Sequence, residues 1–247
     1  MEILFFYSLI FILVTIQTII GVGVLVLGTP LLLIFNYGII EIMNMLLPIS
    51  ILTSLLNYIY LKYNKKNLKI NLDQNIKRTF VFIFLPGISI GLILTKALHQ
   101  FINFEVLVSF VIFLSLIINW KFKKKINFLP LYLKKFVIIF IGIVQGLTNS
   151  GGTLLTIFFT SLNKDKKNQS RYSITFYYLI LVLAQYLIFI IIFEKEIFLD
   201  HFFQIISIVI SALFLGNILV KKISEIFFQR TIEILALFSA IFLLINN

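Results

Sequence analysis

Two short glycine-rich segments carry the polar groups that could bind a ligand in this chain. The first is Gly21-Val22-Gly23 and the second is Asn149-Ser150-Gly151-Gly152, and each interrupts a long apolar stretch. Glycines at such a place break a helix and free backbone N–H and C=O groups, which then need partners inside the protein. A helix that restarts after the break presents N–H groups and the positive end of its dipole, and both suit an oxyanion. The pattern therefore predicts anion binding at the two breaks.

Hydroxyl and amide groups lie at or beside both breaks, and we interpret them together with the glycines as the binding groups. The predicted substrate-binding residues are Gln17, Gly21, Gly23, Gln145, Asn149, Ser150, Gly151, Gly152 and Thr153. Close helix packing is the alternative role for the glycines, and interhelical hydrogen bonding is the alternative for the glutamines. A leucine at position 151 is expected to fill the anion pocket and to leave membrane insertion intact.

The common catalytic and metal-binding patterns are missing from the sequence. There is no GxxxxGK[ST] phosphate loop, no HExxH and no GxSxG, and the absence of cysteine excludes disulfides, thiolate metal sites and cysteine nucleophiles. His99 and His201 are isolated. The acidic residues lie near the ends of apolar stretches, whereas cation carriers usually need a carboxylate inside a span. We expect a protein that is not an enzyme and that has no cofactor and no metal site.

The elements that must position the two breaks are membrane helices. The chain has 247 residues, of which 60% are hydrophobic and 13% are charged, and its mean hydropathy is +1.07. Soluble proteins are about half apolar and about a quarter charged. The apolar runs predict helices near 3–35, 39–61, 79–96, 104–120, 136–162, 172–193, 202–220 and 231–245. The expected fold is an all-α polytopic membrane protein with no soluble domain.

Basic residues indicate which loops face the cytoplasm. The net charge of +11 comes from lysines and arginines between the apolar runs, so they are better read as topology signals than as a nucleic-acid patch. Four groups are expected to be cytoplasmic: Lys62, Lys65, Lys66, Lys69, Lys77 and Arg78; Lys121, Lys123, Lys124, Lys125, Lys134 and Lys135; Lys164, Lys166, Lys167 and Arg171; and Lys221, Lys222 and Arg230. Arg171 is interpreted as a topology anchor, in preference to an anion-binding role at the entrance.

The chain also has the pattern of a tandem repeat. Aligning Gln17 with Gln145 aligns Gly23 with Gly151, which predicts two repeats, 1–125 and 126–247, of about four apolar segments each. If the first and fifth stretches are re-entrant hairpins, every loop obeys the positive-inside rule, and each half has an odd number of crossings. The halves would then be inverted. Eight simple crossings are the alternative, and whether 3–35 and 136–162 cross or re-enter is left open.

The residues around the breaks resemble the paired signatures of the sulfite exporter TauE/SafE family. The resemblance lies in residues 17–23 (QTIIGVG), in 28–32 (GTPLL) and in 142–153 (GIVQGLTNSGGT), and it extends over nearly the whole chain. Pro86-Gly87 to Gly91 and the Arg171 position also fit. The chain departs from the family pattern in its reduced first glycine cluster and in Thr153, where a proline often follows the second Gly-Gly.

This resemblance implies a bacterial inner-membrane, multi-pass permease that moves small anions without nucleotide hydrolysis. The expected function is secondary transport or export of sulfite, a sulfonate or a related oxyanion. The alternative is a membrane scaffold or subunit that transports nothing. The expected partners are a small anionic substrate and the lipid bilayer, with no nucleic acid, and a homodimer is left open. The substrate, the direction of transport and the coupling ion are open as well.

Overall fold

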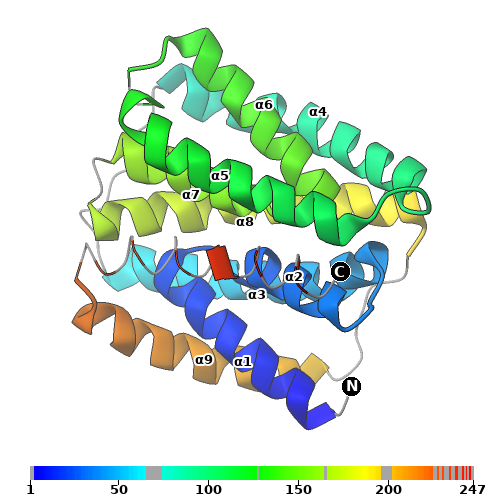
Figure 1. Cartoon of the computed structure of the whole chain (residues 1–247). Coiled ribbons are helices and arrows are strands. Elements are labelled where there is room, and N and C mark those ends of the chain that lie inside the picture. Colours follow the sequence, from blue (N-terminus) through cyan, green and yellow to red (C-terminus); the bar gives the residue numbers. More distant parts are fainter. Residues whose placement is uncertain are drawn as a thin grey trace.

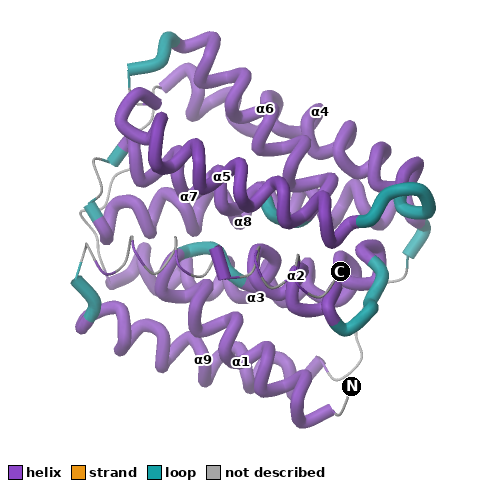
Figure 2. Tube along the Cα trace, viewed as in Figure 1, coloured by secondary structure: helices purple, strands orange, loops and turns teal. Residues whose placement is uncertain are grey.

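Every regular element that the structure describes is a helix (Figure 2). The computed structural model describes residues 3–64, 74–126, 128–163, 166–195 and 202–224, and positions 227, 230, 234, 237, 238, 241, 243 and 245. The helices within these ranges are α1 (Ile3–Ile20), α2 (Val24–Ile34), α3 (Ile39–Asn64), α4 (Gln74–Leu98), α5 (Phe104–Ile126), α6 (Leu131–Thr148), α7 (Gly151–Leu162), α8 (Lys167–Phe193) and α9 (Phe202–Lys222).

Some sequence expectations fall on residues outside these ranges. They concern the basic positions 65–69 and 164, the segment 196–200 with its acidic residues, His201, and most of the predicted stretch 231–245. The side chains of 77–78 and 123–125 are also outside the described part.

The expected all-helical, membrane-spanning character is confirmed. Six helices of the described chain, α3, α4, α5, α6, α8 and α9, are long and apolar enough to cross a bilayer. The first and fifth apolar stretches are each divided into two helices, α1 with α2 and α6 with α7. The interruptions fall at 21–23 and at 149–150, so the predicted breaks are confirmed as well.

Each broken stretch reverses direction at its break. The ring of Phe5, at the start of α1, lies 5.4 Å from the ring of Phe35, which follows α2, so the outer ends of the two helices are neighbours. The chain likewise turns back between α6 and α7 (Figure 1). The first and fifth stretches are therefore hairpins in the folded chain, and the tips of these hairpins point into the protein.

The remaining helices pack around the two hairpins in layers (Figure 1). Helix α6 packs against α4 at one edge of the molecule, α1 packs against α9 at the opposite edge, and α3 packs against α8 between them. Along α3, Ser50 comes before Asn57, but their partners on α8 come in the reverse order. Ser50 contacts Tyr178 and Asn57 contacts Arg171. Helices α3 and α8 are therefore antiparallel.

Glycines allow the closest of these crossings. A Cβ atom added to Gly142 of α6 would lie 2.6 Å from the carbonyl oxygen of Phe84 on α4. A Cβ atom added to Gly146 would lie 2.5 Å from the carbonyl oxygen of Ile88, also on α4. On the other edge, a Cβ atom at Gly216 of α9 would lie 2.7 Å from the Cβ atom of Thr18 on α1. The helix backbones approach each other directly at both edges, as small residues permit in membrane proteins.

Candidate functional site

Gln17 holds the first hairpin together at its tip. Its side-chain oxygen accepts a hydrogen bond from the backbone N–H of Val24, seven residues ahead, at 2.9 Å. Its Nε2 donates to the carbonyl oxygen of Ser50 at 3.0 Å and to Oγ of Ser54 at 2.9 Å, both on α3. The side chain is fully buried. One amide therefore joins the end of α1, the start of α2 and the middle of α3.

Gln145 does the same in the second hairpin. Its side-chain oxygen accepts from the backbone N–H of Gly152, again seven residues ahead, at 3.1 Å, and its Nε2 donates to Gln185 of α8 at 2.7 Å. Gln185 in turn donates to the carbonyl oxygen of Gln145 at 3.2 Å and to Oδ1 of Asn149 at 2.7 Å. Each glutamine thus binds a first-turn N–H of the second half-helix, one of the groups that lack a partner in that helix.

Gly23 and Gly151 are needed for the close approach of the two half-helices. A Cβ atom on Gly23 would lie 2.8 Å from the backbone nitrogen of Gln17, and a Cβ atom on Gly151 would lie 2.8 Å from that of Gln145 and 2.6 Å from the Ile141 carbonyl oxygen. The expectation that leucine at position 151 would fill a pocket and spare the fold is therefore wrong. That side chain would push α7 away from α6.

Gly21 and Asn149 turn the chain at the two tips. Gly21 has φ +103° and Asn149 has φ +60°, in the left-handed region that glycine and asparagine tolerate best. The N–H of each residue donates to the carbonyl oxygen of the glutamine before it, Gln17 at 2.7 Å and Gln145 at 2.9 Å. The same turn therefore ends α1 and α6.

The two tips meet at Gly152 and Tyr178. A Cβ atom on Gly152 would lie 3.0 Å from the Tyr178 ring, 3.0 Å from Val26 of α2 and 3.5 Å from Val22 in the first break. The Tyr178 hydroxyl lies 3.4 Å from Oγ of Ser50 and faces the backbone N–H of Leu25 in the first turn of α2. The starts of α2 and α7 consequently share one buried centre, with Tyr178 between them.

Two buried polar groups next to the tips have no hydrogen-bond partner. One is Nδ2 of Asn149, whose Oδ1 is occupied by Gln185. The other is Oγ1 of Thr175, which lies 3.1 Å from where a Cβ atom on Gly21 would be. Buried polar groups are nearly always paired, so these two groups are available to a ligand that reaches the breaks.

Ser150 and Thr153 are placed differently from the other predicted site residues. The Thr153 hydroxyl donates to the Ser150 carbonyl oxygen at 2.7 Å and lies 3.0 Å from Oγ of Ser115 on α5. The Ser150 hydroxyl donates to the Thr148 carbonyl oxygen at 3.2 Å. These two hydroxyls stabilise the start of α7 and its contact with α5. The structure brings the other predicted residues together around the two tips.

Arg171 is buried inside the protein, which makes its interpretation as a topology anchor wrong. Only 1% of its surface is exposed, and Nε donates to the Thr18 carbonyl oxygen at 2.7 Å. Nη2 donates to Oδ1 of Asn57 at 2.8 Å and to Oδ1 of Asn217 at 2.7 Å. Arg171 is the one buried charged side chain among the residues that the structure describes. Its three acceptors are neutral, so the described interior is electropositive.

Sequence reasoning missed Tyr178 as well. It is one of ten tyrosines and lies in an apolar helix, so nothing in the sequence distinguishes it. The one available signal was the repeat. The alignment of Gln17 with Gln145 shifts the sequence by 128 residues, and the same shift places Tyr178 at the position equivalent to Ser50.

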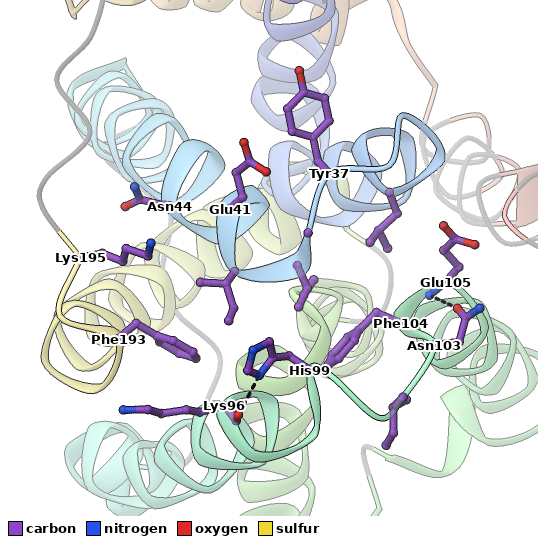
Figure 3. A pocket seen from close by; sticks show the side chains of 15 residues that line it. Tyr37, Glu41, Asn44, Lys96, His99, Asn103, Phe104, Glu105, Phe193 and Lys195 are labelled. Atoms are coloured by element: carbon purple, nitrogen blue, oxygen red, sulfur yellow. Dashed lines mark hydrogen bonds between the residues drawn. The ribbon is translucent and has the colours of Figure 1, made fainter.

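Two pockets lie toward opposite ends of α3. A cavity of about 690 Å³ is lined by the start of α3 and the ends of α2, α4 and α8, and Figure 3 shows Lys96, His99 and Lys195 around it. There, Lys96 donates to the Ile192 carbonyl oxygen at 2.6 Å, and Nδ1 of His99 donates to the Lys96 carbonyl oxygen at 2.8 Å. The second pocket, of about 350 Å³, lies between α3 and α9 and is lined by Leu56 and Tyr60. Ser50, which contacts Tyr178, lies between these two pockets along α3.

Comparison with known proteins identifies a family for this chain. A sequence profile described as sulfite exporter TauE/SafE matches residues 6–243. No curated protein and no solved structure is similar enough to the chain to count as a match. The matched region includes both hairpins and all of the helices that position them, and we conclude that this multi-pass membrane protein belongs to the sulfite exporter TauE/SafE family of membrane transporters.

Proposed function

We propose that the chain is a secondary transporter of a small oxyanion, such as sulfite or a sulfonate, in the bacterial inner membrane. The observation that carries this proposal is the positive character of the buried interior. The starts of α2 and α7 meet there, unpaired donors lie beside both, and the one buried charge of the described chain is Arg171. Helix starts and unpaired donors bind anions, and a buried cation favours one as its counter-charge.

We further propose that residues 1–125 and 126–247 form two inverted repeats. Several paired features support this proposal: each glutamine binds an N–H seven residues ahead, and Gly21 and Asn149 occupy matching turns. Helices α3 and α8, which would be equivalent, are antiparallel. Inverted repeats around a central site are typical of carriers that expose the site alternately to the two sides.

In this proposal, the two pockets are the approaches from the two sides of the membrane. The larger cavity belongs to loops poor in basic residues and would face outward, whereas the α3/α9 pocket includes Lys221 and would face the cytoplasm. Helix α3 has 26 residues, about 39 Å of helix, and this length is enough to carry both approaches and the centre between them. A scaffold without transport would have no need for unpaired buried donors at such a centre.

Efflux from proteoliposomes tests the proposal. Purified protein is reconstituted into vesicles loaded with sulfite, methanesulfonate or acetate, and release is measured against vesicles without protein. We expect saturable efflux of at least one oxyanion, since a single closed centre can hold only a limited number of ions. No flux of any of these anions through protein that melts cooperatively would contradict the proposal.

A further inference from the structure

Arg171 forms a cationic centre that the two helix starts do not include. Its guanidinium binds neutral oxygens of α1, α3 and α9, at Thr18, Asn57 and Asn217. Arginine has five N–H donors, and within the described part of the chain the two on Nη1 have no hydrogen-bond partner. A buried cation that is solvated only by neutral groups is costly unless a counter-charge reaches it. The arrangement is therefore incomplete without an anion.

The pocket between α3 and α9 leads to this centre. It is lined by Leu56, Tyr60, Ile210, Leu213, Phe214, Asn217, Ile218 and Lys221. Asn217 is a wall of the pocket and also an acceptor of Arg171. Asn217 is thus the one polar group that both borders the pocket and directly bonds Arg171 in the described structure. Lys221 contributes a positive charge to the pocket lining.

We propose that Arg171 binds the charge of the transported anion, and that the anion arrives from the α3/α9 pocket by displacing the amide oxygen of Asn217. This inference rests on the proposed function and names the residue that selects for charge. An anionic oxygen binds guanidinium more strongly than an amide oxygen does. The planar fork of Nη1 and Nη2 suits a ligand with two oxygens on one atom, so the ligand class is a sulfur oxyanion or a carboxylate.

The exchange also couples binding to helix movement. The bond between Arg171 and Asn217 connects α8 to α9 beside the pocket, and Nδ2 of Asn217 donates to the Leu213 carbonyl oxygen of its own helix. When an anion replaces the amide oxygen, α8 and α9 lose this link, while Lys167 still bonds the carbonyl oxygens of Val220 and Ile223 and Asn217 keeps its bond within α9. Anion binding would then loosen the contact between α8 and α9 at the level of Asn217.

Asn217→Asp tests the proposal with a nearly isosteric change. The new carboxylate would remain bound to Arg171 and compete with any incoming anion, while the fold keeps its link between α8 and α9. We expect a melting temperature equal to or above that of the wild type. The sulfite concentration that gives half-maximal thermal stabilisation should rise about tenfold or more, as the loss of one charged hydrogen bond implies. Arg171→Gln should raise it similarly if that variant folds.

Lys167→Gln is the matched control. It removes one positive charge from the same helix, and the Lys167 amine donates to the carbonyl oxygens of Val220 and Ile223 at the end of α9. We expect no change in the half-maximal sulfite concentration, because this lysine is not part of the Arg171 centre.

The possible results separate the two proposals. Sulfite that stabilises the wild type but not Asn217→Asp supports the Arg171 assignment, and it does so even if vesicles show no flux, in which case only the transport proposal fails. Equal half-maximal concentrations in the wild type and Asn217→Asp would overturn the assignment, with or without flux. A wild type that no tested anion stabilises would also overturn it.

Discussion

Gln145→Leu is expected to destabilise the folded protein strongly. The leucine leaves the N–H of Gly152 and the side-chain oxygen of Gln185 without their present partner in a buried place. Each such group costs about 1–3 kcal/mol, so the pair costs about 2–6 kcal/mol out of a stability of roughly 5–15 kcal/mol. The yield of monodisperse protein in detergent and its melting temperature measure the effect.

An exposed glutamine provides the comparison. Gln204→Leu makes the same chemical change on the exposed surface of α9 and is expected to keep both yield and melting temperature. If Gln145→Leu were as stable as Gln204→Leu, the second hairpin would not depend on its glutamine. The matching role of Gln17 would then also be in doubt.

The second large effect is expected at the crossing of α6 and α4. Gly142→Ala and Gly146→Ala would each place a methyl group against a carbonyl oxygen of α4, at 2.6 Å and 2.5 Å. Because these neighbours are backbone atoms, the helices must separate, at a cost of about 1–3 kcal/mol or more for each site. The double variant should lose its cooperative thermal transition, which circular dichroism at 222 nm can follow.

Gly38→Ala is the control for this pair. A Cβ atom at Gly38 has no neighbour within 4 Å, so the variant should melt as the wild type does. A double variant Gly142→Ala and Gly146→Ala with wild-type melting would show that α4 and α6 are not in direct backbone contact.

The positions of the breaks could be predicted from local sequence. Glycines in the middle of apolar stretches interrupt helices wherever they lie, and the Gln17–Gln145 alignment indicated which polar residues would share a role. The separate roles of neighbouring glycines could not be predicted in this way. Gly151 faces its own first half-helix and Gly152 faces Val26 and Tyr178, a difference that depends on how α7 is rotated in the fold.

The depth of Arg171 was also beyond sequence analysis. It follows a group of lysines, which is the usual pattern of a residue at the membrane surface. Its acceptors come from α1, α3 and α9 and are far apart in the chain, so only tertiary packing brings them to one guanidinium. Asn57 had no identifiable partner in the sequence for the same reason.

The central claim is that the two hairpin tips form one anion site, and sulfite efflux through Gly152→Ala tests it most directly. The added methyl group would lie 3.0 Å from the side chains of Tyr178 and Val26, which can shift slightly, so the variant should fold. With the exposed variant Ser207→Ala as control, the account predicts that Gly152→Ala lowers efflux about tenfold while the protein still melts cooperatively. Wild-type efflux through both variants would contradict it.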